Sequence, residues 1–543
     1  MTDSPFLHET LLFDPAPATG EALSVIFAFP NTYSVGITSL GYQVVWATLA
    51  RRSDVAVSRL FTDHQEPLPS QPDVVGFSLS WELDYVNLLS HLEHLGLPLH
   101  AEDRGDGHPI VFGGGPVLTA NPEPFAAFFD VILLGDGETL LDDFFDRLSQ
   151  LKTAARDEKL RHLAQMPGVY VPRLYRPIYA DATGPMVAIE PVSDGIPSQV
   201  QKQTYRGNVL STSTVVTPLA AWENIFMVEV VRSCPEMCRF CLASYLTLPF
   251  RTASLEGSLI PAIERGLGVT DRLGLLGASV TQHPEFEPLL NYLNRPQFDH
   301  VRISIASVRT STVTPHLAAT LARHGTRSVT IAVESGAERV RQIVNKKLDT
   351  EAIEAAAINA KAGGLSALKL YGMVGIPGEE MADLEQTTTM MQRLKKAAPG
   401  LRFTLGCSTF VPKAHTPFQW YGVSREAEKR LKFLQKQLGK MGADFRPESY
   451  NWSVIQALIS RGDRRLTPLL EQVRHYGDSL GSYKRAFKAM KGQLPPLEFY
   501  VHDPWPTDQP LPWDHLQGPL PKATLVKHLA EAQSAMAPLH PTA

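Results

Sequence analysis

The stretch Ile225-Phe-Met-Val-Glu-Val-Val231 leads into Cys234-Pro-Glu-Met-Cys238-Arg-Phe-Cys241, so an apolar strand is followed by three cysteines within eight residues. This C-x-x-x-C-x-x-C spacing on one tight loop can hold three irons of a [4Fe–4S] cube, and no fourth cysteine lies nearby. One iron of such a cluster stays open for another ligand. We therefore interpret Cys234, Cys238 and Cys241 as metal ligands and as the catalytic centre.

The three cysteines have two alternative interpretations. A disulfide framework is disfavoured, because four cysteines in 543 residues is sparse usage and one member of the cluster would stay unpaired. A structural zinc site needs a fourth ligand, which Cys407 or a histidine would have to supply from far downstream. Zinc sites more often come as two C-x-x-C pairs, so the iron–sulfur interpretation is preferred.

Cys234, Cys238 and Cys241, with Phe240 just before the last cysteine, resemble the signature of the radical S-adenosylmethionine (SAM) superfamily. In that superfamily the open iron is chelated by the amino and carboxylate groups of SAM, and one electron cleaves the sulfonium to a 5′-deoxyadenosyl radical. The resemblance also implies an electron donor such as a flavodoxin or a ferredoxin. The protein then supplies position, redox tuning and exclusion of water.

Length and composition are typical of a multidomain enzyme. With 543 residues, of which 44% are hydrophobic, roughly three domains are expected. The net charge of −5 argues against broad binding to nucleic acid or to an anionic membrane, although it leaves a local basic patch open. The N-terminus lacks signal-peptide features, and no apolar run approaches the ~20 residues that span a membrane. We expect a cytoplasmic protein without membrane insertion.

Residues 22–165 alternate short apolar strands, expected at 23–29, 74–79, 109–113 and 131–134, with helical stretches. This pattern predicts an α/β fold for residues 1–165, a Rossmann-like domain with a parallel, doubly wound sheet. Such a sheet binds its ligand at the carboxyl ends of the strands. The residues expected there are Ser78, Gly113, Gly114, Gly115, Gly135, Gly137 and Glu138.

The order of these strand ends resembles the cobalamin-binding domain that precedes many radical SAM cores, although glycine-rich turns alone are weak signals. Mutase-type cobalamin domains carry D-x-H-x-x-G after the first strand, where this chain has Asn31-Thr-Tyr33-Ser-Val-Gly36. A neutral phenol is a poor cobalt ligand. Either Tyr33 leaves the lower face of cobalamin without a protein ligand, which favours methyl donation, or the pocket is degenerate and holds no corrinoid.

Two further regions follow. Residues 166–225 contain several proline breaks and predict a strand-rich connector. From 226 to 423 the strand and helix pattern repeats six times, with strands expected at 227–231, 272–276, 301–306, 328–333, 367–374 and 402–410. Six repeats predict an incomplete (β/α)6 TIM-like barrel, whose active residues lie at the carboxyl ends of the strands.

Residues at those strand ends are expected to bind SAM. Ser279 occupies the place of the superfamily's Gly-Gly-Glu-like turn, although that motif is not intact. Ser307 ends the third strand, and Glu334 and Ser335 end the fourth. A carboxylate and hydroxyls suit ribose hydroxyls and a sulfonium amino acid. The alternative for Glu334 is a surface carboxylate that caps the next helix.

The fifth and sixth strands carry further candidates. Gly375-Ile376, at the start of Gly375-Ile-Pro-Gly-Glu379, resembles the region that supports the adenine in the superfamily. Cys407 in the sixth strand is either a methyl carrier, as in some radical SAM methylases, or a small buried residue. His415, on the following proline-bounded turn with Lys413, either transfers a proton to substrate or belongs to a rigid packing turn.

Residues 424–543 are expected to form a mainly helical cap. Their segment Ser460-Arg-Gly-Asp-Arg-Arg465 either binds an anionic substrate, phosphate or RNA, or forms structural ion pairs around Asp463. The motif order resembles radical SAM proteins that contain a cobalamin-binding domain, over nearly the whole chain. That likeness names no substrate.

Three functions follow from these expectations. The leading hypothesis is a cobalamin-dependent radical SAM methyltransferase that acts on an unactivated carbon. The second is a cobalamin-free rearrangement, cyclisation or sulfur insertion, although no second cysteine triad exists for sulfur insertion. The third is a non-catalytic iron–sulfur or corrinoid carrier, which would have no need of a SAM pocket.

Overall fold

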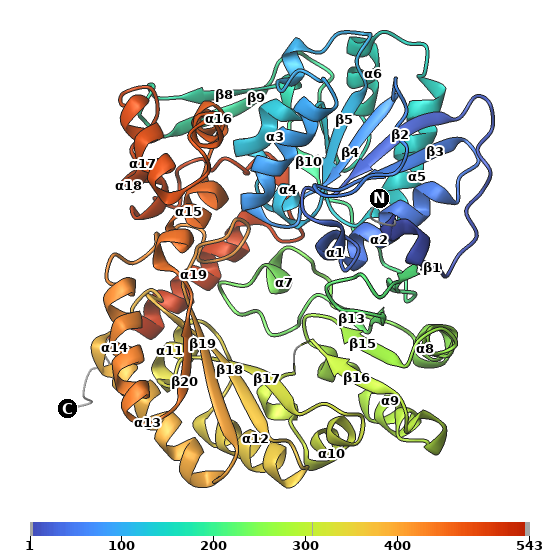
Figure 1. Cartoon of the computed structure of the whole chain (residues 1–543). Helices are drawn as coiled ribbons and strands as arrows, with labels where there is room; N and C mark the ends of the chain where they lie inside the picture. Colours follow the sequence, from blue (N-terminus) through green and yellow to red (C-terminus); the bar gives the residue numbers. More distant parts are fainter. Residues whose placement is uncertain (1–3, 307, 538–543) are drawn as a thin grey trace.

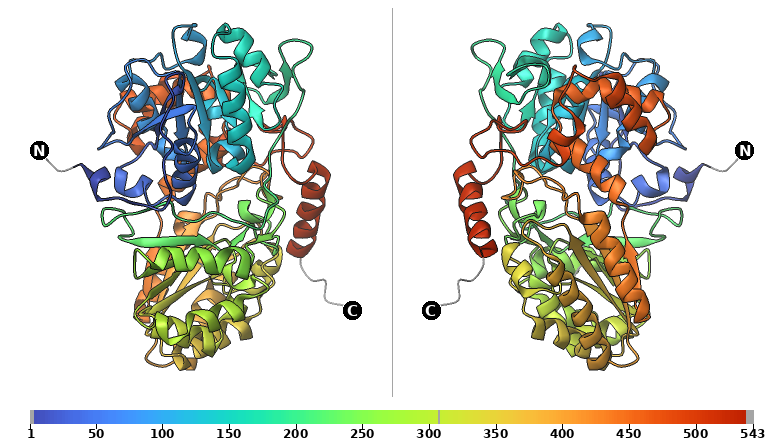
Figure 2. Two further views of the ribbon diagram at one scale, coloured as in Figure 1. Left: turned by 90° about the vertical axis from the view of Figure 1, so that its right-hand side faces the viewer. Right: turned by 90° about the vertical axis from the view of Figure 1, so that its left-hand side faces the viewer.

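The computed structural model describes residues 4–306 and 308–537 and forms two stacked lobes (Figures 1 and 2). The first lobe contains a six-stranded sheet of order β3-β2-β4-β5-β6-β7. The second contains parallel strands arranged as a partial barrel. The predicted fold class, a Rossmann-like α/β domain followed by an incomplete TIM-like barrel, is confirmed.

The first sheet contains the four predicted strands, β2 (Leu23–Ala28), β4 (Val74–Ser78), β5 (Ile110–Gly114) and β6 (Val131–Leu133). Two strands that we did not predict flank them: parallel β3 (Val55–Leu60) and antiparallel β7 (Val169–Tyr170). Arg59 interrupts the apolar pattern of β3, yet its buried guanidinium pairs with Glu9 at 2.8 Å and Glu66 at 2.7 Å. Sequence periodicity could not show these distant partners.

Helices surround this sheet. They are α1 (Tyr33–Gly36), α2 (Leu40–Ala50), α3 (Tyr85–His94), α4 (Pro116–Ala120), α5 (Gly137–Gln150) and α6 (Arg156–Leu163). The connector continues with the hairpin β8 (Tyr175–Tyr179) and β9 (Met186–Pro191). Its short strands β10 (Val200–Gln201) and β11 (Val215–Val216) pair with β21 (Leu516–Gln517) and β1 (Thr10–Leu11), which ties both chain ends to the connector.

The barrel lobe contains all six predicted strands. They are β12 (Ile225–Glu229), β15 (Arg272–Leu276), β16 (Arg302–Ile305), β17 (Ser328–Glu334), β18 (Ala367–Val374) and β19 (Arg402–Thr409). The first three form one sheet and the others a second, and a bridge between Val308 and Ile331 joins them. A seventh parallel strand, β20 (Asp444–Pro447), pairs with β19 from within the region expected to be helical.

Helices cover one face of the barrel strands. They are α8 (Ile260–Leu267), α9 (Phe286–Leu293), α10 (Pro315–Arg323), α11 (Glu338–Ile343), α12 (Thr350–Ala362), α13 (Met381–Ala397) and α14 (Ala427–Lys440). Leu368 and Leu370 of β18 are fully buried, whereas Tyr371 is 57% exposed. Alternation along the strand therefore leaves the other face of the barrel sheet open.

The C-terminal helices divide between the lobes instead of forming one cap. They are α15 (Tyr450–Arg461), α16 (Thr467–His475), α17 (Leu480–Ala489), α18 (Leu497–Val501) and α19 (Lys522–Met536). Thr467 of α16 donates to the Pro124 carbonyl at 3.2 Å, which anchors it to the first lobe, whereas α19 packs on α11 of the barrel. None of the described helices has the length and apolarity required to cross a membrane.

Candidate active site

The cysteine loop, residues 233–250, connects two short antiparallel strands, β13 (Val231–Arg232) and β14 (Arg251–Thr252). The Cys234 amide donates to the Ala243 carbonyl at 3.1 Å, and the Cys241 amide donates to the Cys238 carbonyl at 2.9 Å. The short helix α7 (Leu242–Tyr245) begins immediately after Cys241. The loop is thus folded back on itself by its own backbone.

All three cysteines line one cavity of about 190 Å³. Of the predicted SAM-contacting residues, Phe240, Ser279 and Glu334 also line it. The cavity brings in four charged residues that the sequence did not reveal as site residues: Glu236, Arg309, Lys346 and Lys347. Glu236 lies inside the cysteine motif and Arg309 two residues after Ser307, but no local pattern marked Lys346.

The cysteines suit a cluster better than a single ion. Among the residues that the structure describes, no group of three or more His, Cys, Asp or Glu is arranged to hold one metal ion. A [4Fe–4S] cube instead takes each thiolate on a different iron. Burial raises the pKa of Cys238 to about 12 and also raises that of Cys241, so these thiols ionise readily only beside a cationic group such as iron.

A buried ion pair forms another wall of the cavity. Glu334 follows a bulge at the end of β17 and accepts a 2.7 Å hydrogen bond from the Lys346 ammonium. Burial alone would lower the pKa of Lys346, but Glu334 and Cys238 raise it above its ordinary value. Glu334 is 7% exposed and faces the cavity, so the alternative of a surface helix cap does not apply.

A second charged group lies opposite. Glu236 accepts a 2.6 Å hydrogen bond from Gln282 and pairs with Arg309, and Ser279 donates to the side-chain oxygen of Gln282. Burial raises the pKa of Glu236, but Arg309 and Gln282 outweigh it and hold the pKa below its ordinary value. The cavity therefore presents both anionic and cationic groups, which suits a zwitterionic amino acid moiety.

Left-handed backbone conformations concentrate around this cavity. Eight non-glycine residues of the described chain have positive φ, and five of them, Ser233, Met237, Glu334, Asn345 and Lys347, belong to the cavity or its supporting loops. Such conformations are uncommon away from glycine and cluster at functional sites. The Asn345 side chain donates to the Met237 carbonyl at 2.8 Å, which holds two of these strained loops together.

The C-terminal helix α19 braces the cysteine loop from outside, alongside the barrel (Figure 2). Arg239, between Cys238 and Phe240, pairs with Glu531 of α19 at 3.1 Å and donates to the Ile343 carbonyl at 2.8 Å. The Tyr245 hydroxyl lies 2.8 Å from His528 of α19. Residues nearly three hundred positions apart thus position the loop.

A second cavity, of about 240 Å³, lies at the carboxyl ends of the first lobe's sheet. Its deep wall is apolar and includes Phe27, Phe112 and Leu141. The predicted residues that line it are Ser78, Gly114, Gly115, Gly135, Gly137 and Glu138. Gly113 does not, because a Cβ at that position would meet Leu118 and Phe129 in the core.

The glycines of this cavity serve two different purposes. Gly115 has φ of 109°, and a Cβ there would approach the Leu79 carbonyl oxygen to 2.5 Å, so this glycine makes room for protein backbone. At Gly114 the nearest atom to an added Cβ is the Leu133 carbonyl oxygen, at 3.9 Å. Gly114 is therefore the strand-end glycine that leaves space for a ligand.

The prediction that Tyr33 faces a corrinoid needs correction. Tyr33 does not line the cavity and is 2% exposed. Its hydroxyl donates to the Glu9 carboxylate at 2.7 Å, and its ring packs edge-on against Phe6 and Phe61. Burial and Glu9 raise its pKa well above the usual value for tyrosine. The residue is a neutral core side chain.

Other predicted SAM contacts also lie outside the cysteine cavity. The Gly375 amide donates to the Glu379 carboxylate at 2.7 Å, and Ile376 is buried in the core. The Ser335 hydroxyl accepts from the Ala337 amide at 3.2 Å. These residues therefore stabilise the ends of β17 and β18 and do not face the cavity. Ser307 lies outside the described residues.

Cys407 and His415 both occupy structural positions. Cys407 is 2% exposed and points with Phe403 and Leu405 toward the helices, away from the open face of the sheet. His415 is buried close to Trp513, and burial lowers its pKa to about 4. Neither residue lines the cysteine cavity.

The arginine segment after α15 is also structural, as its ion-pair alternative predicted. Arg464 pairs with Glu123 at 3.1 Å and Arg465 with Asp463 at 2.7 Å. Arg461 stacks over the Trp505 ring at 3.8 Å and donates to the Tyr500 carbonyl at 2.6 Å. None of the three is free to bind an anionic substrate.

Lys413 joins the two lobes, and its replacement is expected to destabilise the fold. Its ammonium lies 2.5 Å from the mostly buried Glu82 carboxylate and 2.9 Å from the Ser460 hydroxyl. Lys413→Met would leave Glu82 unpaired, so we expect a loss of about 3 kcal/mol in urea unfolding at pH 7.

The pH dependence of this loss follows from Glu82. Burial raises the pKa of Glu82, but Lys413 and neighbouring donors outweigh it and lower the pKa below its ordinary 4.5. The stabilisation is therefore present above pH 4.5 and lost as the pH falls through the lowered pKa. Lys429→Met, which breaks an exposed pair with Glu426, should change stability by less than about 1 kcal/mol. Equal effects of the two variants would contradict this role.

Comparison with known protein families shows the superfamily to which this chain belongs. Residues 44–172 match the family described as Radical SAM proteins, N-terminal, and residues 228–391 match the Radical SAM superfamily. The second match contains the cysteine loop and both charged walls of its cavity. This chain is a radical SAM protein, of a superfamily whose members use a [4Fe–4S] cluster and SAM.

Individual relatives extend over most of the chain. Uncharacterized protein MJ0966 of Methanocaldococcus jannaschii is 26% identical over 467 residues, 85% of this chain and 94% of that protein. The radical SAM methyltransferase TsrM from Kitasatospora setae, with cobalamin and a [4Fe–4S] cluster bound, covers 87% of this chain and 99% of its own at 13% identity and a TM-score of 0.49. The cobalamin-dependent SAM radical enzyme OxsB, with aqua-cobalamin and SAM bound, is similar over 95% of this chain and 79% of its own. Its sequence identity is 12% and its TM-score is 0.48.

Proposed function

We propose that this radical SAM enzyme is a cobalamin-dependent methyltransferase that acts on an unactivated carbon. One observation carries the proposal: the two cavities share a single segment of chain. Arg232 lines the cavity of the first lobe, and Cys234, two residues later, lines the cysteine cavity. A corrinoid and a cluster bound in these cavities would be neighbours.

A network of charges holds this shared segment. Arg232 pairs with Glu138 at 2.6 Å and with Glu229 at 2.7 Å, and Arg251 pairs with Asp136 at 2.5 Å. Asp136 and Glu138 belong to the first lobe, whereas the arginines flank the cysteine loop. The network therefore fixes the distance between the cavities and makes Arg232 a positioning residue.

The residues present fit the three cofactors. Cys234, Cys238 and Cys241 would hold the cluster, and Phe240, Ser279, Glu334, Lys346 and Arg309 would surround SAM. The cluster, when bound, supplies the electron that cleaves SAM, which it receives from a donor such as a flavodoxin or a ferredoxin. Glu334 and Glu236 would orient the SAM ammonium, and Lys346 or Arg309 its carboxylate.

The first-lobe cavity suits an aromatic base, such as the one that ends the nucleotide tail of cobalamin. The apolar residues at the bottom of the cavity would contact the base. Ser78, Asp136 and Arg232 at its polar entrance would contact the polar groups attached to the base. No histidine lines the cavity, so among the described residues there is no imidazole for cobalt at this site. A corrinoid held here would receive no imidazole from these lining residues, which would suit its use as a methyl donor.

Gly114→Phe tests the cavity directly. Because Gly114 has no left-handed backbone and faces open space, a phenyl ring there would fill the cavity without a backbone clash. We expect corrinoid in protein purified anaerobically from cobalamin-supplied cells to fall at least about tenfold, while cluster iron is retained. Absorption spectra after cluster reconstitution measure both.

Gly20→Phe is the matched control, since a Cβ at Gly20 would meet nothing within 4 Å. It should retain wild-type corrinoid content. Wild-type protein that carries a full cluster but no corrinoid would overturn the methyltransferase proposal and direct assays to cobalamin-free radical chemistry.

A further inference from the structure

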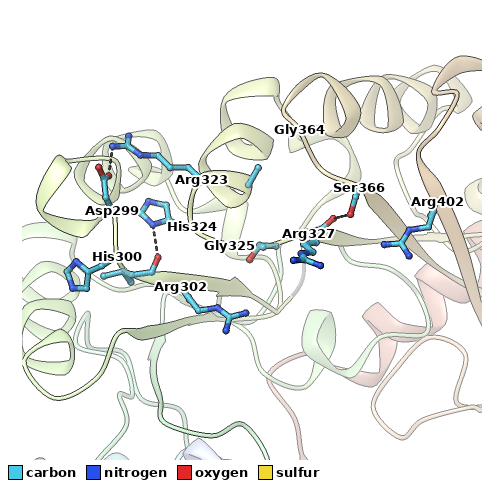
Figure 3. A pocket seen from close by; sticks show the side chains of 13 residues that line it. Asp299, His300, Arg302, Arg323, His324, Gly325, Arg327, Gly364, Ser366 and Arg402 are labelled. Atoms are coloured by element: carbon cyan, nitrogen blue, oxygen red, sulfur yellow. Dashed lines mark hydrogen bonds and ion pairs between the residues drawn. The ribbon is translucent and has the colours of Figure 1, made fainter.

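Three arginines lie together at the amino-terminal edge of the barrel sheet, far from both cavities described above. Arg302 begins β16, Arg327 precedes β17, and Arg402 begins β19. All three line one open cavity of about 1110 Å³. Figure 3 shows their side chains along this edge, where strand β18 lies between β17, which follows Arg327, and β19, which begins at Arg402.

These guanidinium groups lack counter-charges. None of the three guanidinium groups forms an ion pair or a hydrogen bond with any residue that the structure describes. The nearby carboxylates are already engaged, because Asp299 pairs with Arg323 and Asp271 lies 3.5 Å from His300. Three uncompensated positive charges thus share one concavity on a chain whose net charge is −5.

The strand geometry decides on which face of the sheet the arginines lie, and hydrogen bonds fix their backbone. Ile303 and Phe403 are buried against the helices, so the preceding Arg302 and Arg402 lie on the open face of the sheet. The Arg402 amide donates to the Ser366 carbonyl at 3.1 Å, and the Ser366 hydroxyl donates to the Arg327 carbonyl at 3.2 Å. The edge is therefore pre-organised, and an anion bound there would relieve repulsion among the arginines.

The site is separate from the radical chemistry. β17 starts next to Arg327 and ends at Glu334 in the cysteine cavity, seven residues later. At ~3.3 Å per residue the two sites are about 20 Å apart. A small ligand bound at the arginines cannot reach the atoms that react at the other end of the strands.

We propose that this edge of the barrel binds the phosphate groups of a small-molecule ligand. Planar guanidinium groups match phosphate oxygens in bidentate geometry, and three of them match a multiply charged phosphate better than a single carboxylate. A concave site of this kind suits a small ligand and not a flat docking surface. The site goes beyond the proposed methyl transfer and does not depend on it.

Inorganic pyrophosphate is the probe, titrated calorimetrically into cluster-reconstituted protein at constant ionic strength. We expect saturable binding and a rise in melting temperature with pyrophosphate concentration. Acetate at the same concentration should give neither. The variant with Arg302→Gln, Arg327→Gln and Arg402→Gln together should bind pyrophosphate at least about tenfold more weakly.

Arg323→Gln is the matched control, because Arg323 lines the same cavity but already pairs with Asp299. It should bind pyrophosphate like the wild type. SAM cleavage by the triple variant should stay at the wild-type level, which also reports that the variant is folded. Undiminished binding by the triple variant, absence of binding by the wild type, or equal binding of acetate would overturn the proposal.

Discussion

Cys238→Ala is expected to lose the cluster and all reductive cleavage of SAM. Cys238 is the most enclosed of the three loop cysteines, at 7% exposure, and its thiol lies 3.8 Å from the Asn345 carbonyl. Two thiolates do not retain a cubane that lacks its third protein ligand. Reconstituted iron should fall from about four per chain to near zero, and 5′-deoxyadenosine should fall to background.

Cys407→Ala provides the control for Cys238→Ala. Cys407 is also buried, at 2% exposure, but lies in the core of the barrel, on the side of the sheet that packs against helices. It should keep the full iron content and SAM cleavage, with only a modest loss of stability from the small cavity. If Cys238→Ala retains iron and cleaves SAM, the assignment of the cluster ligands is wrong.

Glu334→Gln is expected to weaken SAM binding about ten- to a hundredfold. A hydrogen bond between a carboxylate and a charged ligand is worth about 1.5–3 kcal/mol, and each 1.4 kcal/mol corresponds to a tenfold change in affinity. The substitution keeps the size of the side chain. Equilibrium binding of SAM to the reconstituted enzyme, with cluster iron measured in parallel, gives the result.

The buried partner of Glu334 requires its own control. Glu334→Gln leaves Lys346 without its counter-charge, so part of any loss could reflect a distorted cavity. The double variant Glu334→Gln, Lys346→Met restores neutrality and should still bind SAM weakly. Glu338→Gln, on the exposed side of α11, should bind SAM normally. Wild-type affinity in the Glu334 variants would show that Glu334 does not bind SAM.

The predictions from sequence succeeded where the signal was local. Strands β15 and β18 begin and end at the residues that apolar periodicity indicated, and the cysteine motif lines one cavity. Strand β20 was missed because its segment Asp444-Phe-Arg-Pro447 shows no apolar alternation beyond Phe445 and ends in a proline, which is unfavourable in strands. It forms only because the exposed edge of β19 pairs with it.

Several motif-based expectations failed for a shared reason. Gly375 and Ile376 follow a strand end, as a ligand contact should, yet the chain turns there into the core instead of the cavity. Tyr33 occupies the position of a metal ligand in the sequence, but its hydroxyl donates a hydrogen bond to the Glu9 carboxylate. Position along a motif does not specify which way a side chain faces once distant segments pack around it.

The sequence by itself determined the two sheets, the order of the domains and the cluster chemistry, because strand periodicity and cysteine spacing act over a few residues. Only the tertiary structure decided that Lys346 faces Glu334, that the C-terminal helix braces the cysteine loop, and that Arg302, Arg327 and Arg402 share one edge. These groups meet because parallel strands gather their ends at a common edge, so residues far apart in the chain become neighbours.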